Sequence, residues 1–448
     1  MRVAALIESM AARETPCLVW RGATVSGTEL EARRRAWLRV LDEKSLGPGA
    51  VVGLKGDYTP DSISLLFALL GRGCVASLVP ASAVVETPYM EDGRIEVLFQ
   101  FDAAGAWTWE PAPEAPETPA HPLIAALRAR GEAGFTIFSS GSTGHPKAVL
   151  HSAERFLAKF DRPGKPFRTL AFLLFDHIAG LDTLFYTLSA GGTLVLPARR
   201  DPLSVCRLVH EHRIQVLPAS PAFLSLLCLS GDHRDFDLSS LEIITYGSEP
   251  MSQQTLDLLC GIFPAARLVQ KYGTSEFGAP RARSRGNDSL WLKLKTDELD
   301  AKVVDGMLWI RSETAMMGYL NAPSPFDEAG WYCTGDMVER EGEWLPILGR
   351  KSDIIVVGGE KVYPQEVEAA VLEMETVEDV LVKGEPHPIM GHIVTAEVRL
   401  RGGPRDAAAV RKEVRKHCRE RLAPYKIPAK VRIAEGPLTT GRHKKVRQ

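Results

Sequence analysis

One stretch of the chain, residues 135–149, gathers the groups best suited to hold a polyphosphate. An apolar run leads into a segment of hydroxyls and glycines that is followed by Lys147. Gly141 and Gly144 let the backbone turn sharply and present its N–H groups to an anion. The lysine adds a positive charge, and further donors come from the hydroxyl groups of Ser139, Ser140, Ser142 and Thr143. These residues predict a phosphate-binding loop.

A Walker loop does not fit this stretch. That motif, Gly-x4-Gly-Lys-Ser/Thr, has a glycine directly before its lysine and a hydroxyl residue directly after it. Here Pro146 precedes Lys147 and Ala148 follows it. A plain Ser/Gly surface turn would explain the glycines and hydroxyls alone. It does not explain a Pro-Lys pair at this offset after an apolar run, so we keep the phosphate-binding interpretation.

The loop resembles the signature of the AMP-forming adenylating enzymes, the superfamily of acyl-CoA synthetases, adenylation domains and beetle luciferases. The match extends over almost the whole chain and is greatest to an acyl- or aryl-CoA synthetase. Further stretches follow in family order: Asp176–Leu181, Tyr246–Pro250, Lys271–Gly278, Met317–Asn321, Gly330–Asp336, Ile347–Glu368 and Ala423–Pro428.

Hydrophobic patterning predicts an α/β fold, because strand-like and helix-like runs alternate and so favour a largely parallel sheet. We expect helices over 29–42, capped by Ser26, and over 61–70, with strands over 50–54, 73–79 and 170–175. The resemblance implies a large N-terminal domain of layered sheets and helices, residues 1–350. It also implies a small, mobile α+β C-terminal domain, residues 353–448, with a hinge at 351–352.

The resemblance assigns roles around a bound nucleotide. Tyr272 would stack on adenine, the Ser275 hydroxyl would meet the α-phosphate, and Asp336 would accept hydrogen bonds from both ribose hydroxyls. Glu276 would hold Mg²⁺, an ion that prefers carboxylate and phosphate oxygens. The expected nucleotide contacts also include Arg350, Gly247, Ser248, Glu249, Gly273 and Thr274.

The resemblance also places the wall of the acid pocket. His177 would lie in that wall, although a histidine at this point can equally cap a helix or be satisfied in the core. Asp176 poses a second possibility, because amino-acid-activating relatives place an aspartate here to hold the substrate ammonium. The acyl-CoA register puts apolar Ile178 at the ammonium position, which favours an acid without an α-amino group. The other expected acid contacts are Gly180, Tyr246, Gly247 and Gly278.

The C-terminal tail departs from the family pattern. Relatives end with Gly-Lys, whose lysine reaches the carboxylate and the α-phosphate during adenylation. Here residues 437–448 contain no Gly-Lys pair. Three registers compete: the glycine favours Arg442, the spacing from Pro428 favours Lys444, and the following valine favours Lys445. We favour Lys444 as the catalytic residue of the tail.

The composition of the chain limits the kinds of partner that can be expected. The 448 residues are 45% hydrophobic and 25% charged, which is typical of a globular protein. A formal net charge of −2 gives no electrostatic argument for nucleic acid or an anionic membrane as a partner. No apolar run reaches the roughly 18 residues of a membrane span. Seven scattered cysteines without Cys-x-x-Cys spacing indicate reduced core residues and a cytoplasmic protein, whose oligomeric state stays open.

The resemblance thus implies ATP-dependent activation of a fatty or aromatic acid to acyl-AMP, with release of pyrophosphate. A thiol would then take the acyl group, either coenzyme A or the phosphopantetheine of an acyl carrier protein. Gly358 and Gly359 resemble the family's pantetheine-tunnel element. The alternatives are a stand-alone amino-acid adenylation domain and a nucleotide or acyl-AMP binding protein that has lost catalysis through its altered tail. Lys147, Glu276 and Asp336 argue against the latter.

Overall fold

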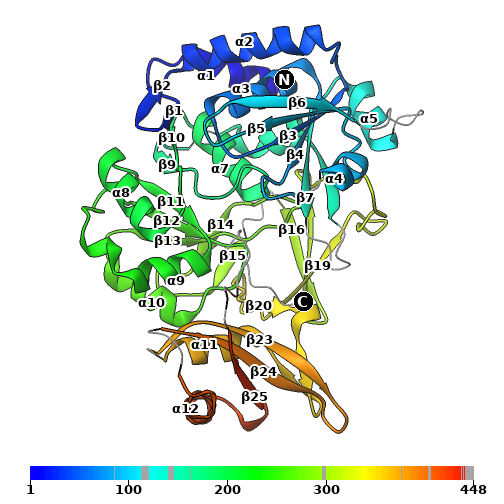
Figure 1. The fold of residues 1–448 in the computed structure, drawn as a ribbon. Coiled ribbons are helices and arrows are strands. Elements are labelled where there is room, and N and C mark those ends of the chain that lie inside the picture. Colours follow the sequence, from blue (N-terminus) through cyan, green and yellow to red (C-terminus); the bar gives the residue numbers. More distant parts are fainter. Residues whose placement is uncertain are drawn as a thin grey trace.

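The computed structural model of the protein describes residues 1–84, 86–112, 121–139, 146–162, 164–294, 299–374, 376–401, 405–434, 436 and 438. Figure 1 shows two large sheets with their helices above a smaller unit, which holds the last strands and helices of the chain. This is the mixed α/β arrangement that the alternation of strand and helix patterns predicts.

One seven-stranded sheet has the order β13-β12-β11-β9-β10-β1-β2 and is parallel except at its edge strand β2. Helices α8, α9 and α10 bury their apolar faces against it in one cluster. The strands are β1 (Leu18–Trp20), β2 (Ala23–Val25), β9 (Arg168–Leu170), β10 (Thr193–Leu196), β11 (Val216–Ala219), β12 (Ile243–Tyr246) and β13 (Arg267–Gln270), and the helices are α8 (Pro202–His212), α9 (Pro221–Ser230) and α10 (Gln253–Ile262).

The second seven-stranded sheet has the order β18-β8-β7-β4-β3-β5-β6. Its four central strands are parallel, and β6, β8 and β18 are antiparallel to their neighbours. The strands are β3 (Val51–Lys55), β4 (Val75–Val79), β5 (Val97–Phe101), β6 (Trp107–Pro111), β7 (Gly134–Ser139), β8 (Lys147–Ser152) and β18 (Gly318–Tyr319). Because β7 runs into the phosphate loop and β8 leaves it, this sheet positions Lys147.

A layer of helices joins the two sheets. One apolar cluster contains residues of both sheets together with α1, α2, α3, α6 and α7, whereas α4 and α5 pack on the other face of the second sheet. The helices are α1 (Arg2–Ala11), α2 (Gly27–Glu43), α3 (Pro60–Arg72), α4 (Thr87–Asp92), α5 (Pro122–Arg130), α6 (Ala153–Leu157) and α7 (Ile178–Ser189). Ser26 caps α2 in a capping box with Glu29, as its position before the helical pattern predicts.

Two smaller sheets follow residues 271–278. The antiparallel sheet β16-β17-β19-β20 carries Asp336 and Arg350 on neighbouring strands, and β14 pairs with β15. Their bounds are β14 (Ala282–Ser284), β15 (Leu292–Leu294), β16 (Leu299–Val304), β17 (Met307–Ser312), β19 (Tyr332–Val338) and β20 (Ile347–Arg350).

The last part of the chain forms its own sheet and core. The sheet has the order β22-β21-β24-β23, with β25 on β24, and its apolar cluster draws only on residues after 354. The elements are β21 (Ile355–Val357), β22 (Glu360–Val362), α11 (Pro364–Leu372), β23 (Val377–His387), β24 (Gly391–Leu400), α12 (Ala407–Arg419) and β25 (Lys430–Ile433). Short 3-10 turns lie at Ala158–Phe160, Asp232–Arg234, Lys351–Asp353 and Pro424–Lys426.

The strand predicted over 170–175 is wrong beyond Leu170. Strand β9 ends there, and the Ala171 N–H then donates to the Val195 carbonyl of the neighbouring strand at 2.9 Å. The Arg200 side chain then donates to the carbonyls of Ala171 and Phe172, at 3.3 and 2.6 Å. A side chain therefore satisfies backbone groups that a further strand pairing would otherwise have used.

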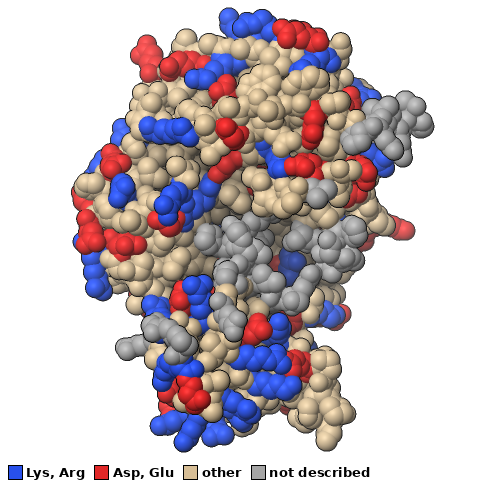
Figure 2. Space-filling model, in the orientation of Figure 1, with Lys and Arg blue, Asp and Glu red and all other residues tan. Residues whose placement is uncertain are grey.

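The surface and the cysteines agree with the composition. Figure 2 shows Lys and Arg interspersed with Asp and Glu over the visible face. All seven cysteines are free, and five are buried. Within the described ranges, no helix has both the length and the apolar character needed to cross a membrane.

Candidate functional site

The end of the phosphate loop is fixed by an asparagine from a distant part of the chain. The Asn321 side chain accepts from the Ala148 N–H at 2.9 Å and donates to the Pro146 carbonyl at 2.8 Å. These bonds hold the backbone on both sides of Lys147. Ser139 ends β7 opposite Lys147. Ser140, Gly141, Ser142, Thr143 and Gly144 lie outside the described residues, so their phosphate contacts stay predictions.

Lys147 and Glu276 meet at one tyrosine. The Lys147 Nζ lies 4.9 Å from the centroid of the Tyr319 ring, and the Tyr319 hydroxyl donates to Glu276 Oε1 at 2.8 Å. Burial raises the pKa of Tyr319, and the negative charge of Glu276 raises it further. The phenol therefore stays protonated at neutral pH and donates to the carboxylate. A cation and a carboxylate from two distant stretches thus share one site.

Asp336 is held in the same way by a second tyrosine. The Tyr272 hydroxyl donates to Asp336 Oδ2 at 2.6 Å, and Arg350 Nε lies 3.4 Å from Asp336 Oδ1. Burial raises the pKa of Asp336, whereas the hydrogen bond from Tyr272 and the charge of Arg350 act in the opposite direction. The structure brings together these three residues, which the sequence predicts as nucleotide contacts.

The turn between Tyr272 and Gly278 is tight, and it presents Glu276. The Gly278 N–H donates to the Thr274 carbonyl at 2.9 Å, which closes the turn. A Cβ on Gly273 would lie 2.3 Å from the Gly278 carbonyl oxygen, so only glycine fits there. The Thr274 hydroxyl accepts from the Glu276 N–H at 3.2 Å.

A buried histidine fixes the other side of this turn. The Nε2–H of His151, on β8, donates to the Ser275 carbonyl at 2.7 Å. The imidazole stacks on Phe135, with ring centroids 4.9 Å apart. Burial lowers the pKa of His151 to about 4, so the ring is neutral at pH 7. His151 therefore links the strand that begins at Lys147 to the backbone beside Glu276.

The donor set fits a metal ion that arrives with a nucleotide. Among the described residues, no group of three or more His, Cys, Asp or Glu side chains is placed to hold a metal by itself. The Glu276 carboxylate, in a residue that is 8% exposed, accepts from Tyr319 through Oε1. Mg²⁺ usually takes one or two carboxylates and completes its shell with phosphate oxygens and water. Glu276 fits that role.

The expected acid contacts lie around the start of α7. His177 caps this helix, because its Nδ1 accepts from the Ala179 N–H at 3.2 Å. This is the capping alternative; contact with the acid stays a prediction. A Cβ on Gly180 would lie 1.9 Å from the Leu174 carbonyl oxygen, so the glycine allows α7 to approach the preceding loop. Asp176 is 4% exposed.

Tyr246 and the turn after it are used partly for packing. Tyr246 is 2% exposed and belongs to the apolar cluster of the first sheet, so its contact with an acid stays a prediction. A Cβ on Gly247 would lie 2.5 Å from the Lys271 carbonyl oxygen, which brings the two predicted turns together. Ser248 has φ +70°, and Glu249 Oε1 accepts from the Ala222 N–H at 2.8 Å.

The two glycines predicted for the thiol arm form the turn between β21 and β22. Gly358 and Gly359 have φ values of +60° and +92°, a region that glycine adopts without strain. The Gly358 N–H donates to the Met390 carbonyl at 2.8 Å. Contact with a pantetheine arm stays a prediction. Arg442, Lys444 and Lys445 lie outside the described residues.

Besides His151, sequence reasoning assigned no role to three residues of this site. They are Tyr319, Asn321 and Tyr332. Burial raises the pKa of Tyr332, and the negative charge of Glu276 raises it further. All three lie in stretches that match the family order, which is the signal that could have identified them. Their contacts depend on strands distant in sequence, so a single sequence gives no partner for them.

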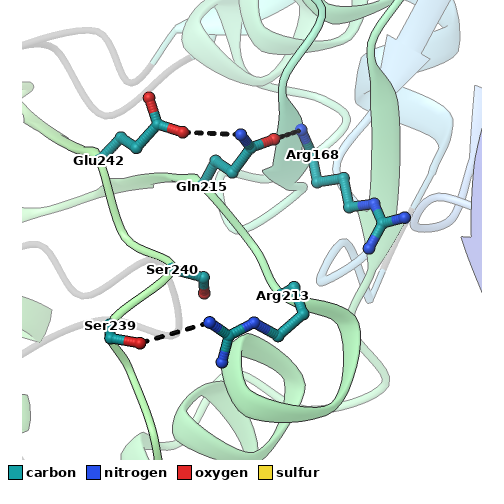
Figure 3. A pocket seen from close by; sticks show the side chains of 6 residues that line it. All are labelled: Arg168, Arg213, Gln215, Ser239, Ser240 and Glu242. Atoms are coloured by element: carbon teal, nitrogen blue, oxygen red, sulfur yellow. Dashed lines mark hydrogen bonds between the residues drawn. The ribbon is translucent and has the colours of Figure 1, made fainter.

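A separate polar hollow lies at the opposite end of the first sheet, at the starts of β9, β11 and β12 (Figure 3). There the Gln215 side chain accepts from the Arg168 N–H and donates to Glu242, and Arg213 donates to Ser239. Its polar groups thus satisfy one another. Ligands of open α/β sheets bind at the carboxyl ends of the strands, where Tyr246 and Gln270 lie. The hollow is therefore not part of the candidate site.

Comparison with known families finds two matches. The family model described as AMP-binding enzyme matches residues 8–320, and the model described as AMP-binding enzyme C-terminal domain matches residues 366–444. The first match covers more than half of the chain. Its range contains Lys147, Tyr272, Glu276 and Tyr319.

Curated relatives are similar at moderate identity. A long-chain-fatty-acid–CoA ligase of Bacillus subtilis (strain 168) is 30% identical over 323 residues, 65% of this chain. The match spans 56% of that ligase, so less than two thirds of its length is covered. The medium/long-chain-fatty-acid–CoA ligase FadD8 of Mycobacterium tuberculosis (strain ATCC 25618 / H37Rv) is 26% identical, with 95% of this chain and 85% of FadD8 covered.

Solved structures share the fold over nearly all of the chain. The anthranilate CoA ligase AuaEII, in complex with anthranoyl-AMP, superimposes with a TM-score of 0.83 at 19% identity, covering 99% of this chain and 95% of that one. The o-succinylbenzoate CoA synthetase of Bacillus subtilis gives 0.77 at 21%, covering 99% and 96%. The fold is therefore the two-domain arrangement of these proteins, a large N-terminal and a smaller C-terminal domain.

Proposed function

This chain belongs to the AMP-binding enzyme family, and we propose that it activates a carboxylic acid with ATP and passes the acyl group to a thiol. The first step forms acyl-AMP and releases pyrophosphate. The second forms a thioester and releases AMP. Relatives are named for long-chain fatty acids and for anthranilate, and we propose that the acid is fatty or aromatic.

The observation that carries this proposal is that tyrosines hold Lys147, Glu276 and Asp336 in one region, where the charges of both carboxylates act on Arg350. Tyr319 joins the lysine to Glu276, and Tyr272 donates to Asp336. A nucleotide bound here would have its ribose at Asp336 and its phosphates between Glu276 and Lys147. The arrangement offers a carboxylate for ribose hydroxyls and a cation for phosphate oxygens at the same time.

In the first step, no side chain needs to form a covalent bond with the substrates. An oxygen of the acid's carboxylate attacks the α-phosphorus, and the bond from that phosphorus to the pyrophosphate oxygen breaks. Lys147 would align the phosphates and offset their negative charge as the bonds change. Mg²⁺ bound with the nucleotide at Glu276 would neutralise further phosphate charge. The Tyr319 hydroxyl and His151 would keep the Glu276 carboxylate and its backbone in place.

The second step requires a thiol to reach the acyl carbon. Sulfur attacks that carbon, the bond to the AMP oxygen breaks, and the thiol proton passes to solvent. We propose that the domain of residues 353–448 rotates against residues 1–350 about a hinge near Ser352 between the steps, which brings Gly358 and Gly359 to the site. Coenzyme A is the favoured acceptor, and an acyl carrier protein is the alternative.

We propose that the tail supplies a second cation during adenylation, from Lys444. The expected result is that Lys444→Ala abolishes pyrophosphate exchange, while Arg442→Ala and Lys445→Ala retain it. Each variant binds ATP as the parent does if only the catalytic contact is lost. Unchanged exchange in Lys444→Ala, with loss in one of the other two variants, would move the role to that residue.

ATP–pyrophosphate exchange across fatty, aromatic and amino acids tests the whole proposal. Exchange with a fatty or aromatic acid supports it, and AMP release that depends on coenzyme A identifies the acceptor. Exchange with amino acids alone would favour the adenylation-domain alternative and a role for Asp176. No exchange with any acid, despite measurable ATP binding, would favour a nucleotide-binding protein without catalysis.

The seven free cysteines suit a reducing compartment, and we propose that the protein acts in the cytoplasm.

A further inference from the structure

A buried ion pair lies beside the proposed acid pocket. Lys159, in the 3-10 turn after α6, forms an ion pair with Asp182 on α7. The side chains are 5% and 17% exposed. A lysine is rarely buried this deeply, because removing its charge from water is costly. A buried pair of this kind at a substrate wall calls for an explanation.

The pair touches two segments that the proposed function assigns to the acid. A Cβ on Gly278 would lie 3.5 Å from Lys159 Nζ, and Gly278 follows Glu276 by two residues. Asp182 lies on α7 two residues after Gly180. The pair therefore bridges the turn that presents Glu276 and the helix that His177 caps. An acid with its carboxylate near Glu276 would direct its far end along this wall.

Aromatic rings surround the ammonium. Lys159 Nζ lies 3.9 Å from the Phe156 ring centroid and 5.0 Å from that of Phe160. Phe156 also approaches Gly278, where an added Cβ would lie 3.2 Å from Cε2. Tyr186 lies edge-on to Phe160, with centroids 6.2 Å apart. Flat rings in such a wall pack well against an aromatic substrate.

The ammonium keeps hydrogen-bonding capacity. Within the described part of the chain, Asp182 is its one hydrogen-bond acceptor, and an ammonium has three N–H donors. The backbone that carries Lys159 is held in place, since Arg281 donates to the carbonyls of Lys159 and Arg162, at 3.0 and 3.4 Å. The backbone position of Lys159 is thus fixed beside the two rings.

Resting on the proposed function, we propose that Lys159 and Asp182 determine substrate choice: the acid is aromatic and carries a hydroxyl, amino or carbonyl group at its far end. Such a group can donate to Asp182 or accept from Lys159. Because the pair cancels its own charge, it favours a neutral polar group over a second carboxylate. A long alkyl chain would remove the hydrogen bonds between the pair and water without replacing them, which is unfavourable.

The test compares acids that differ in one group. Pyrophosphate-exchange kcat/KM is measured for 4-hydroxycinnamate, cinnamate, octanoate and palmitate. We expect the parent protein to favour 4-hydroxycinnamate over cinnamate and over palmitate by about tenfold or more. Lys159→Met should reduce the hydroxyl preference at least tenfold and leave cinnamate nearly unchanged.

A double variant covers the case in which a lone Asp182 prevents folding. Lys159→Met/Asp182→Leu replaces the pair with apolar side chains, a change that buried pairs often tolerate. We expect it to lose the hydroxyl preference and to gain on octanoate. Lys55→Met is the matched control, because Lys55 pairs with Glu86 at similar burial elsewhere in the protein. It should keep the parent's preferences.

The outcomes separate the two proposals. The role of the pair would be overturned if the parent protein exchanged best with palmitate, or if both variants kept the hydroxyl preference. Either result would leave the proposed adenylation intact. Exchange with none of the four acids, nor with any of the wider panel, would overturn the proposed function and this inference with it.

Discussion

The two ends of the candidate site treat charge differently. At the proposed nucleotide end, Glu276 accepts from the neutral hydroxyl of Tyr319, and Asp336 accepts from Tyr272 beside Arg350. At the proposed acid end, Lys159 and Asp182 pair with each other against aromatic rings. A phenol leaves the charge of Glu276 uncancelled, whereas an ion pair largely removes it. Glu276 can therefore attract a metal ion, and the pair of Lys159 and Asp182 can only select by hydrogen bonding.

The largest effects of substitution are expected at the proposed nucleotide end. Lys147→Met and Glu276→Gln should each lower the kcat of exchange about 10²–10³-fold, because groups aimed at developing charge contribute most to such steps. Pyrophosphate exchange at saturating ATP measures the loss. Thermal melting of both variants should stay near that of the parent. A variant that folds normally and keeps more than half of the parent's activity would remove its residue from the mechanism.

Asp336 should affect binding of ATP more than the chemical step. Asp336→Asn weakens hydrogen bonds to a charged acceptor, worth about 1.5–3 kcal/mol, so the KM for ATP should rise roughly tenfold or more. Tyr272→Phe keeps the carboxylate and removes one donor, and we expect a smaller rise. Equal effects of the two variants would mean that the tyrosine, rather than the carboxylate, makes the main contact.

His151 is linked to both proposed ends, because it donates to the Ser275 carbonyl and its pKa responds to the charge of Lys159. Burial lowers the pKa of its imidazole to about 4, the charge of Lys159 acts in the same direction, and the hydrogen bond to Ser275 opposes both. The folded pKa lies below the unfolded value of about 6.5, so the unfolded chain binds the proton more readily. The stabilising contribution is complete above pH 6.5 and is lost as pH falls toward 4.

His151→Phe keeps a ring on Phe135 and removes this titration. Between pH 6.5 and 5 the parent should lose about 2 kcal/mol more of its free energy of unfolding than the variant, at about 1.4 kcal/mol per pH unit. Melting at several pH values, in matched ionic strength, measures the difference. Parallel pH profiles for the two proteins would show that His151 is not held neutral by burial.

Much of the local structure follows from the sequence. The cap at Ser26, the helix expected over 61–70 and the strand expected over 50–54 lie within two residues of where the patterns predict them, because caps and apolar periodicity are local signals. The strand expected over 170–175 fails for the opposite reason. Arg200, distant in sequence, takes the carbonyls that a further pairing needed.

The sequence by itself determined the phosphate-loop prediction and the family resemblance, since a motif is a property of neighbouring positions, and the resemblance implied the candidate roles of Glu276 and Asp336. Only the tertiary structure decided that Tyr319 joins Lys147 to Glu276, that Tyr272 donates to Asp336 and that Lys159 is buried against Asp182. Each of these contacts joins residues from separate elements, and burial and hydrogen-bond geometry exist only once those elements have packed.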